Sequence, residues 1–71
     1  MNKGANMEIR AGTLVECVGK YCIAPIGTVG IVVRKHKECE NTYLVNWYKD
    51  IVRLEEGNSE FVVISDIEVF K

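Results

Sequence analysis

The alternation of apolar and polar residues along the chain predicts five short β-strands. We place them near residues 13–18, 27–35, 42–49, 60–64 and 68–70, where β-branched and aromatic residues concentrate. Glycine-rich and polar segments separate these strands. We find no window of eleven residues with the apolar spacing of an amphipathic helix. The pattern therefore predicts an all-β fold, in which a small closed or half-closed barrel would remove most exposed strand edges.

The same alternation assigns an inner face to each predicted strand. Asn46 marks the outer face of the third strand, so Tyr43 and Trp47 should point inward with Val45 between them. In the second strand we expect Val29, Ile31 and Val33 to point inward, with Gly30 marking a close backbone approach or a bend. The predicted core is Val15, Cys17, Val29, Ile31, Val33, Val45, Trp47, Val63, Ile67 and Val69.

Three segments lie outside this strand pattern. Residues 1–11 are polar and aperiodic, which predicts a flexible N-terminal tail before a barrel that spans residues 12–71. Residues 49–60 allow either one helical turn capped by Asp50 or a continuation of the third strand through 51–54, and the pattern favours the continuation. Residues 65–67 predict a tight 3₁₀ turn before the last strand.

Length and composition limit the possible functions. The 71 residues allow one domain, and 48% hydrophobic with 27% charged residues is a globular balance. A net charge of −1 lacks the basic excess that is typical of nucleic-acid-binding domains. No apolar run approaches the ~20 residues of a membrane span, and none follows Lys3 as in a secretory signal. We therefore expect a cytoplasmic protein without a membrane partner.

The cysteines favour free thiols over a metal site. Their number, three, does not fit a framework of disulfides. A zinc site could combine Cys17 and Cys22 with His36 and Cys39, but neither pair has the tight C-x2-C spacing of zinc ribbons. If the first two strands pair antiparallel, these two pairs lie at opposite ends of the barrel. We expect no bound metal and no cofactor.

Three segments resemble parts of the SH3-like barrel. Residues 12–18 (GTLVECV) resemble its G-x-x-V opening strand, and residues 27–32 (GTVGIV) resemble its G-T-x-G-x-V second strand. Residues 62–69 (VVISDIEV) resemble its ending, in which a 3₁₀ turn precedes the last strand. The resemblance covers residues 12–70 and implies a five-stranded SH3-like small barrel.

Two groups of SH3-like proteins are nearest in pattern. One holds the electron-transport accessory barrels, namely the stromal accessory subunit of photosystem I and the variable chain of ferredoxin–thioredoxin reductase, with the barrel of the nitrile hydratase β-chain. In these an aromatic loop precedes G-T-V, as Tyr21 precedes residues 27–29 here. The other group holds short SH3-like proteins of bacteria and phages. Peptide-binding SH3 domains differ, because they carry an acidic first loop and a tryptophan pair, whereas residues 19–24 lack an acid and Trp47 stands alone.

The leading functional hypothesis is protein–protein interaction. Tyr21, Ile23 and Pro25 lie in a loop that should be at the surface, and Tyr48 should point outward from its strand. These four residues form the predicted partner-binding patch. We therefore expect a small non-catalytic binding module or accessory subunit, whose partner is an unidentified protein or a larger complex.

Two other hypotheses rest on the hairpin around residue 36. The basic run Arg34, Lys35, His36 and Lys37 could bind nucleic acid, with stacking by Tyr43, Trp47 and Tyr48. Glu38 and Glu40 follow that run directly and offset its charge. A nucleophilic pair of Cys39 and His36 is conceivable, but no pocket or oxyanion donor accompanies it, so we expect no enzymatic activity.

Overall fold

Five strands and one 3₁₀ turn make up the fold in the computed structural model, which describes residues 8–49, 51, 54 and 57–70. The elements are β1 (Leu14–Cys17), β2 (Val29–Lys35), β3 (Thr42–Trp47), β4 (Ser59–Val63), the 3₁₀ turn η2 (Ile64–Asp66) and β5 (Ile67–Val69). No α-helix occurs within the described residues. The predicted all-β class, the five strands and the 3₁₀ turn before the last strand are confirmed.

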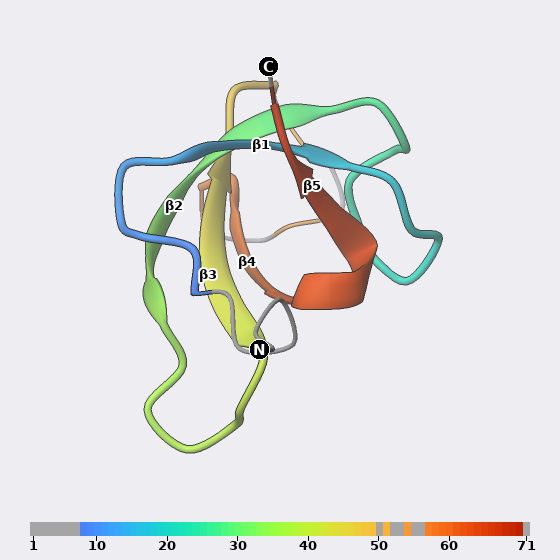
Figure 1. The fold of residues 1–71 in the computed structure, drawn as a ribbon. Helices are drawn as coiled ribbons and strands as arrows, with labels where there is room; N and C mark the ends of the chain where they lie inside the picture. Colours follow the sequence, from blue (N-terminus) through green and yellow to red (C-terminus); the bar gives the residue numbers. More distant parts are fainter. Residues whose placement is uncertain (1–7, 50, 52–53, 55–56, 71) are drawn as a thin grey trace.

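The strands form one antiparallel sheet in the order β4-β3-β2-β1-β5. The sheet curls, so that β1 and β5 lie across β3 and β4 with the core between them (Figure 1). β4 and β5 are therefore the two edges of the sheet. The long loop between β1 and β2 and the hairpin between β2 and β3 project from different parts of it (Figure 1).

The inner face of β3 is as predicted, with Tyr43, Val45 and Trp47 buried. Asn46 is exposed and marks the outer face, because a polar amide remains in contact with water there. The predicted burial of Val15 and Cys17 is also confirmed. The buried apolar residues are Val15, Cys17, Ala24, Val32, Tyr43, Val45, Trp47, Ile51, Val62 and Ile67.

The predicted inner face of β2 is wrong. Val32 is buried, whereas Val33 is 43% exposed because it is the extra residue at the bulge where the register against β3 shifts. Gly30 also faces inward, where a Cβ would lie 2.7 Å from a ring carbon of Trp47 and 2.8 Å from the carbonyl oxygen of Asn46. The close approach predicted at this glycine is confirmed, and the indole of Trp47, the main chain of Asn46 and the side chain of Val45 all take part in it.

The last two strands also correct the predicted core. Val62 pairs with Tyr43 and is buried, whereas Val63 is 46% exposed on the outer face. Val69 pairs with Val15 but is also exposed, because it ends a short strand at the edge of the sheet. In β4 the face follows the pairing, since the adjacent Val62 and Val63 give no polar marker. Val69 lies on the same face as Val15 and is exposed by its position at the end of the edge strand.

The predicted continuation of the third strand is wrong at the positions that are described. β3 ends at Trp47, and the N–H of Leu54 donates to the carbonyl of Ile51 at 3.0 Å, which is the three-residue spacing of a turn. The N–H of Ile51 donates to Oδ1 of Asn58 at 3.1 Å. Asp50, the predicted cap of the alternative helical turn, lies outside the described residues.

The first described residues contact the sheet. Ile9 packs against the core, and its N–H donates to the hydroxyl of Tyr43 at 3.2 Å. Lys35 forms an exposed ion pair with Glu8 at 3.3 Å. Of the segment predicted as a tail, residues 1–7 lie outside the described residues.

Candidate protein-interaction site

The loop between β1 and β2 is closed at its base by main-chain hydrogen bonds. The N–H of Gly27 donates to the carbonyl of Cys17 at 2.7 Å. Both the N–H and the hydroxyl of Thr28 donate to the carbonyl of Pro25, at 3.1 and 2.7 Å. Inside the loop, the thiol of Cys17 lies 3.3 Å from the carbonyl oxygen of Gly19 and 3.6 Å from that of Ala24. The main chain of this loop is therefore held from within.

Glu60, on β4, fastens the same loop from outside. Its carboxylate accepts the N–H groups of Ile23 and Ala24, at 2.8 and 3.1 Å, and the indole N–H of Trp47 at 2.9 Å. One carboxylate thus joins β3, β4 and the middle of the loop. Glu60 was not among the residues that the sequence pattern singled out. Its inward direction follows from the pairing with the buried Val45, which the alternation along the chain did not indicate.

The start of the loop packs closely on η2. The N–H groups of Val18 and Gly19 both donate to the carbonyl of Asp66, at 2.8 and 3.1 Å. A side chain at Gly19 has no room, because its Cβ would collide with the carboxylate of Asp66. This contact fixes where the loop leaves β1.

The predicted partner-binding residues are exposed on this fixed backbone. Tyr21 is 82% exposed, and Ile23 and Pro25 are also exposed. Ile26, which the prediction did not include, is 65% exposed. Ala24, between two of the predicted residues, is turned into the core, and Cys22 packs against it. The loop therefore presents several apolar side chains to water.

Tyr48, the fourth predicted residue, lies beside the end of the loop. It is 65% exposed, and its N–H donates to the carbonyl of Val29 at 2.9 Å. Val29 is the residue after Thr28, where the loop enters β2. The structure thus brings Tyr48 to the point where the loop ends, while the other three predicted residues lie within the loop.

Cys17 and Cys22 are brought together beneath the loop. Their thiols are in hydrogen-bonding contact, and the thiol of Cys22 also lies 3.9 Å from the carbonyl oxygen of Asp66. Burial, and then the contact with Cys17, raise the pKa of the Cys22 thiol far above its ordinary value. A thiol that keeps its proton is a poor nucleophile. No group of three or more His, Cys, Asp or Glu side chains in the described ranges is arranged to hold a metal ion.

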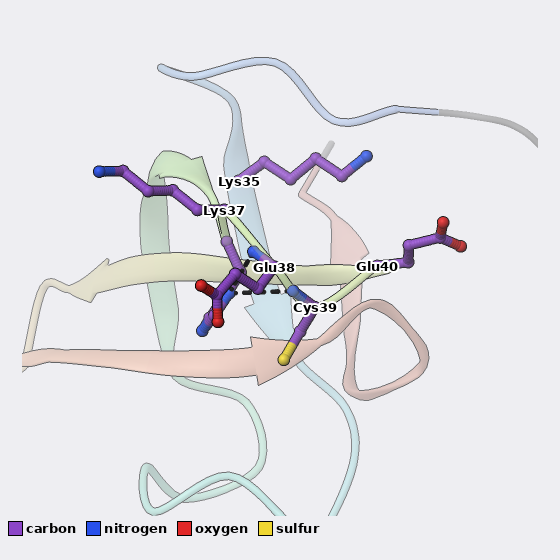
Figure 2. Close-up of a pocket in the computed structure, with 6 residues that line it drawn as sticks. Lys35, Lys37, Glu38, Cys39 and Glu40 are labelled. Atoms are coloured by element: carbon purple, nitrogen blue, oxygen red, sulfur yellow. Dashed lines mark hydrogen bonds between the residues drawn. The ribbon is translucent and has the colours of Figure 1, made fainter.

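The hairpin between β2 and β3 folds around His36. Nδ1 of this residue accepts the N–H groups of Glu38 and Cys39, both at 3.0 Å (Figure 2). Among the described residues, the imidazole of His36 makes no hydrogen bond to the thiol of Cys39, so the conceived nucleophilic pair is not formed in this arrangement. The hairpin encloses an open hollow of about 270 Å³, whose lining residues are Lys35, His36, Lys37, Glu38, Cys39 and Glu40.

The basic residues of the hairpin do not form one surface. Lys35 and Lys37 extend in opposite directions (Figure 2), and Lys35 is paired with Glu8. The guanidinium of Arg34 lies 5.4 Å from the centre of the Phe61 ring. Of the aromatic residues considered for base stacking, Tyr43 and Trp47 are buried, and Tyr48 alone is exposed. The nucleic-acid hypothesis thus loses two of its three stacking residues.

No helix within the described residues is long and apolar enough to span a membrane. Comparisons of the chain with protein-family profiles, with curated proteins and with solved structures found no match.

Proposed function

We propose that this chain is a small non-catalytic binding module or accessory subunit that acts through protein–protein interaction. The observation that carries the proposal is the loop between β1 and β2, whose main chain is fastened while its apolar side chains face water. Glu60 fixes the middle of the loop, and Tyr21 beside that point is 82% exposed. The patch comprises Tyr21, Ile23, Pro25 and Tyr48, together with Ile26.

The hydrogen bonds that hold the loop support a binding role, because they lower the free-energy cost of binding. Ordering a flexible loop on binding costs free energy, and a loop that is already ordered avoids most of this cost. Tyrosine is enriched in protein interfaces because it supplies a large apolar area with few rotatable bonds. A loop that served only to connect two strands would be expected to carry polar side chains toward water. Tyr21 and Ile26 are instead large and apolar.

We also propose a relationship to the SH3-like barrels and a cytoplasmic location. Support for the first comes from the antiparallel sheet with its 3₁₀ turn before the last strand, and from the residues that resemble those barrels. Support for the second comes from the free thiols of Cys17, Cys22 and Cys39, which suit a reducing compartment.

The test compares partner binding and folding in the same variants. After a binding partner has been purified from the source cells, its affinity is measured for the native chain and for Tyr21→Ala, Tyr48→Ala and Phe70→Ala. Phe70 is an exposed aromatic outside the loop and serves as the control. We expect the two tyrosine variants to lose about 1 kcal/mol or more of binding free energy, and the control to lose little.

Thermal unfolding of the same variants decides between a contact surface and a core. A contact residue should change the free energy of unfolding by no more than about 0.5 kcal/mol. If both tyrosine variants unfold at much lower temperature and bind the partner normally once folded, the patch belongs to the core and the proposal fails. Retention on a DNA column that disappears with salt would favour the nucleic-acid alternative.

A further inference from the structure

Among the described residues, three positions on the outer edge of β4 have no main-chain partner. The N–H of Trp47 donates to the carbonyl of Asn58, and the N–H of Ile64 donates to the carbonyl of Asn41, so residues 58 and 64 face β3. In an antiparallel pair the residues that face the partner alternate with those that face away. Ser59, Phe61 and Val63 therefore direct their N–H and C=O groups away from β3, and none has a main-chain partner among the described residues.

These positions are symmetric about Phe61. A second copy of β4, placed antiparallel across a twofold axis at Phe61, opposes Phe61 to Phe61 and Ser59 to Val63. In that register, each edge N–H of one chain meets an edge C=O of the other, and no edge group remains unpaired.

The side chains on the outer face of β4 suit this pairing. Ser59, Phe61 and Val63 carry no charge, so no like charges of the strand itself meet across the axis. One part of the Phe61 ring is already in contact with His36, at 4.7 Å between ring centres, and with Arg34. The ring nevertheless remains 45% exposed. Glu60, the one charged residue of the strand, turns inward to its three N–H donors.

β4 also lacks three of the features by which exposed strand edges usually avoid pairing, and its inward-pointing charge, Glu60, is hydrogen-bonded to three N–H donors. Lysine, proline and β-bulges are the common protective devices, and none occurs in Ser59–Val63. The opposite edge of the sheet, β5, is three residues long and carries Glu68 on its outer face. We propose that β4 is a self-association surface, which pairs antiparallel with β4 of a second copy of this chain about a twofold axis at Phe61.

Self-association is tested with the full chain by sedimentation equilibrium, from about 10 µM to about 1 mM, because so short an interface should be weak. We expect a reversible equilibrium between monomer and dimer. Phe61→Lys opposes two lysines across the axis and should weaken the dimer about tenfold or more. Phe61→Leu keeps an apolar side chain and all edge hydrogen bonds, and it should retain the dimer. Circular dichroism and thermal unfolding verify that both variants fold.

A cross-linking experiment tests the register without relying on Phe61→Lys. In a Cys39→Ser background, Phe61→Cys places two thiols across the axis, with Cα atoms about 5.5 Å apart and within disulfide range. Oxidised glutathione should convert this variant to a disulfide-linked dimer much faster than Glu68→Cys in the same background. The proposal is overturned if the chain stays monomeric throughout the range, if Phe61→Lys folds and dimerises as well as the native chain, or if both positions cross-link equally.

Discussion

At the scale of single residues, Glu60 connects more of the fold than any other described side chain. Its carboxylate accepts hydrogen bonds from the loop main chain at Ile23 and Ala24 and from the indole of Trp47. The last two donors are partly buried, so water replaces the carboxylate poorly if it is removed. A strand of alternating residues normally directs carboxylates to water, which is why the pattern gave no reason to place Glu60 inside.

Replacement of Glu60 should therefore cost more stability than its partial exposure suggests. We expect Glu60→Ala to lower the free energy of unfolding by about 1–3 kcal/mol, because partly buried N–H donors lose their acceptor. Urea unfolding measures this effect, and Glu68→Ala, an exposed carboxylate on β5, is the matched control with little expected change. Equal free energies of unfolding for the two variants would show that the three hydrogen bonds of Glu60 contribute nothing to stability.

Cys22 should make stability depend on alkaline pH. Burial and the contact with Cys17 raise the pKa of its thiol in the folded protein above the value in the unfolded chain. Above about pH 8.5 the unfolded chain begins to release this proton while the folded protein retains it. The unfolded state then binds fewer protons, so the free energy of unfolding falls as pH rises.

Urea unfolding from about pH 7 to about pH 10 tests this sign. The decline in stability should be shallower in Cys22→Ala than in the native chain, because the variant lacks the shifted group. Cys39→Ala removes an exposed thiol and should keep the native decline. Identical slopes in all three proteins would contradict a raised pKa at Cys22.

At the scale of elements, the sequence was informative where a polar residue marked one face of a strand. Asn46 sufficed to orient β3 and hence Trp47. In β2 both faces are apolar, so the alternation fitted either orientation, and the bulge at Val33 shifted it further. The exposed loop residues could be predicted from their position between strands. The hydrogen bonds from the loop to Glu60 could not be predicted, because they join residues about 36 positions apart along the chain.

The inward position of Gly30 gives a direct test of the corrected face of β2. Gly30→Ala should lower the free energy of unfolding by about 1–3 kcal/mol, because the added methyl group overpacks the space against Trp47. Val33→Ala, at the exposed bulge, is the control and should change it by no more than about 0.5 kcal/mol.

A double-mutant cycle tests whether the indole of Trp47 causes the loss of stability in Gly30→Ala. In a Trp47→Leu background, Gly30→Ala should cost clearly less than in the native chain, because the smaller side chain leaves room for the methyl group. If Gly30→Ala costs the same in both backgrounds, the main chain at Asn46 and not the indole sets the requirement for glycine.

At the scale of the whole molecule, the folded unit reaches further toward the N-terminus than the strand pattern indicates. Ile9 packs against the core and bonds to the hydroxyl of Tyr43. Ile9→Ala should therefore lower the free energy of unfolding by about 1–2 kcal/mol, since part of its side chain is buried. Glu8→Ala removes only an exposed ion pair and should cost no more than about 0.5 kcal/mol. Thermal unfolding of the two variants side by side measures the difference, and equal effects would exclude Ile9 from the folded unit.

In the loop between β1 and β2, the groups that hold the backbone differ from the side chains that face water. The hydrogen bonds that hold the loop use main-chain groups of Ile23, Ala24, Pro25 and Gly27, with Glu60 as the outside acceptor. The side chains of Tyr21 and Ile26 take no part in these bonds. They can therefore be exchanged without altering the path of the backbone, much as a rigid hypervariable loop accepts new residues. Evolution or library selection can accordingly vary the surface chemistry of this small scaffold by substituting those positions alone.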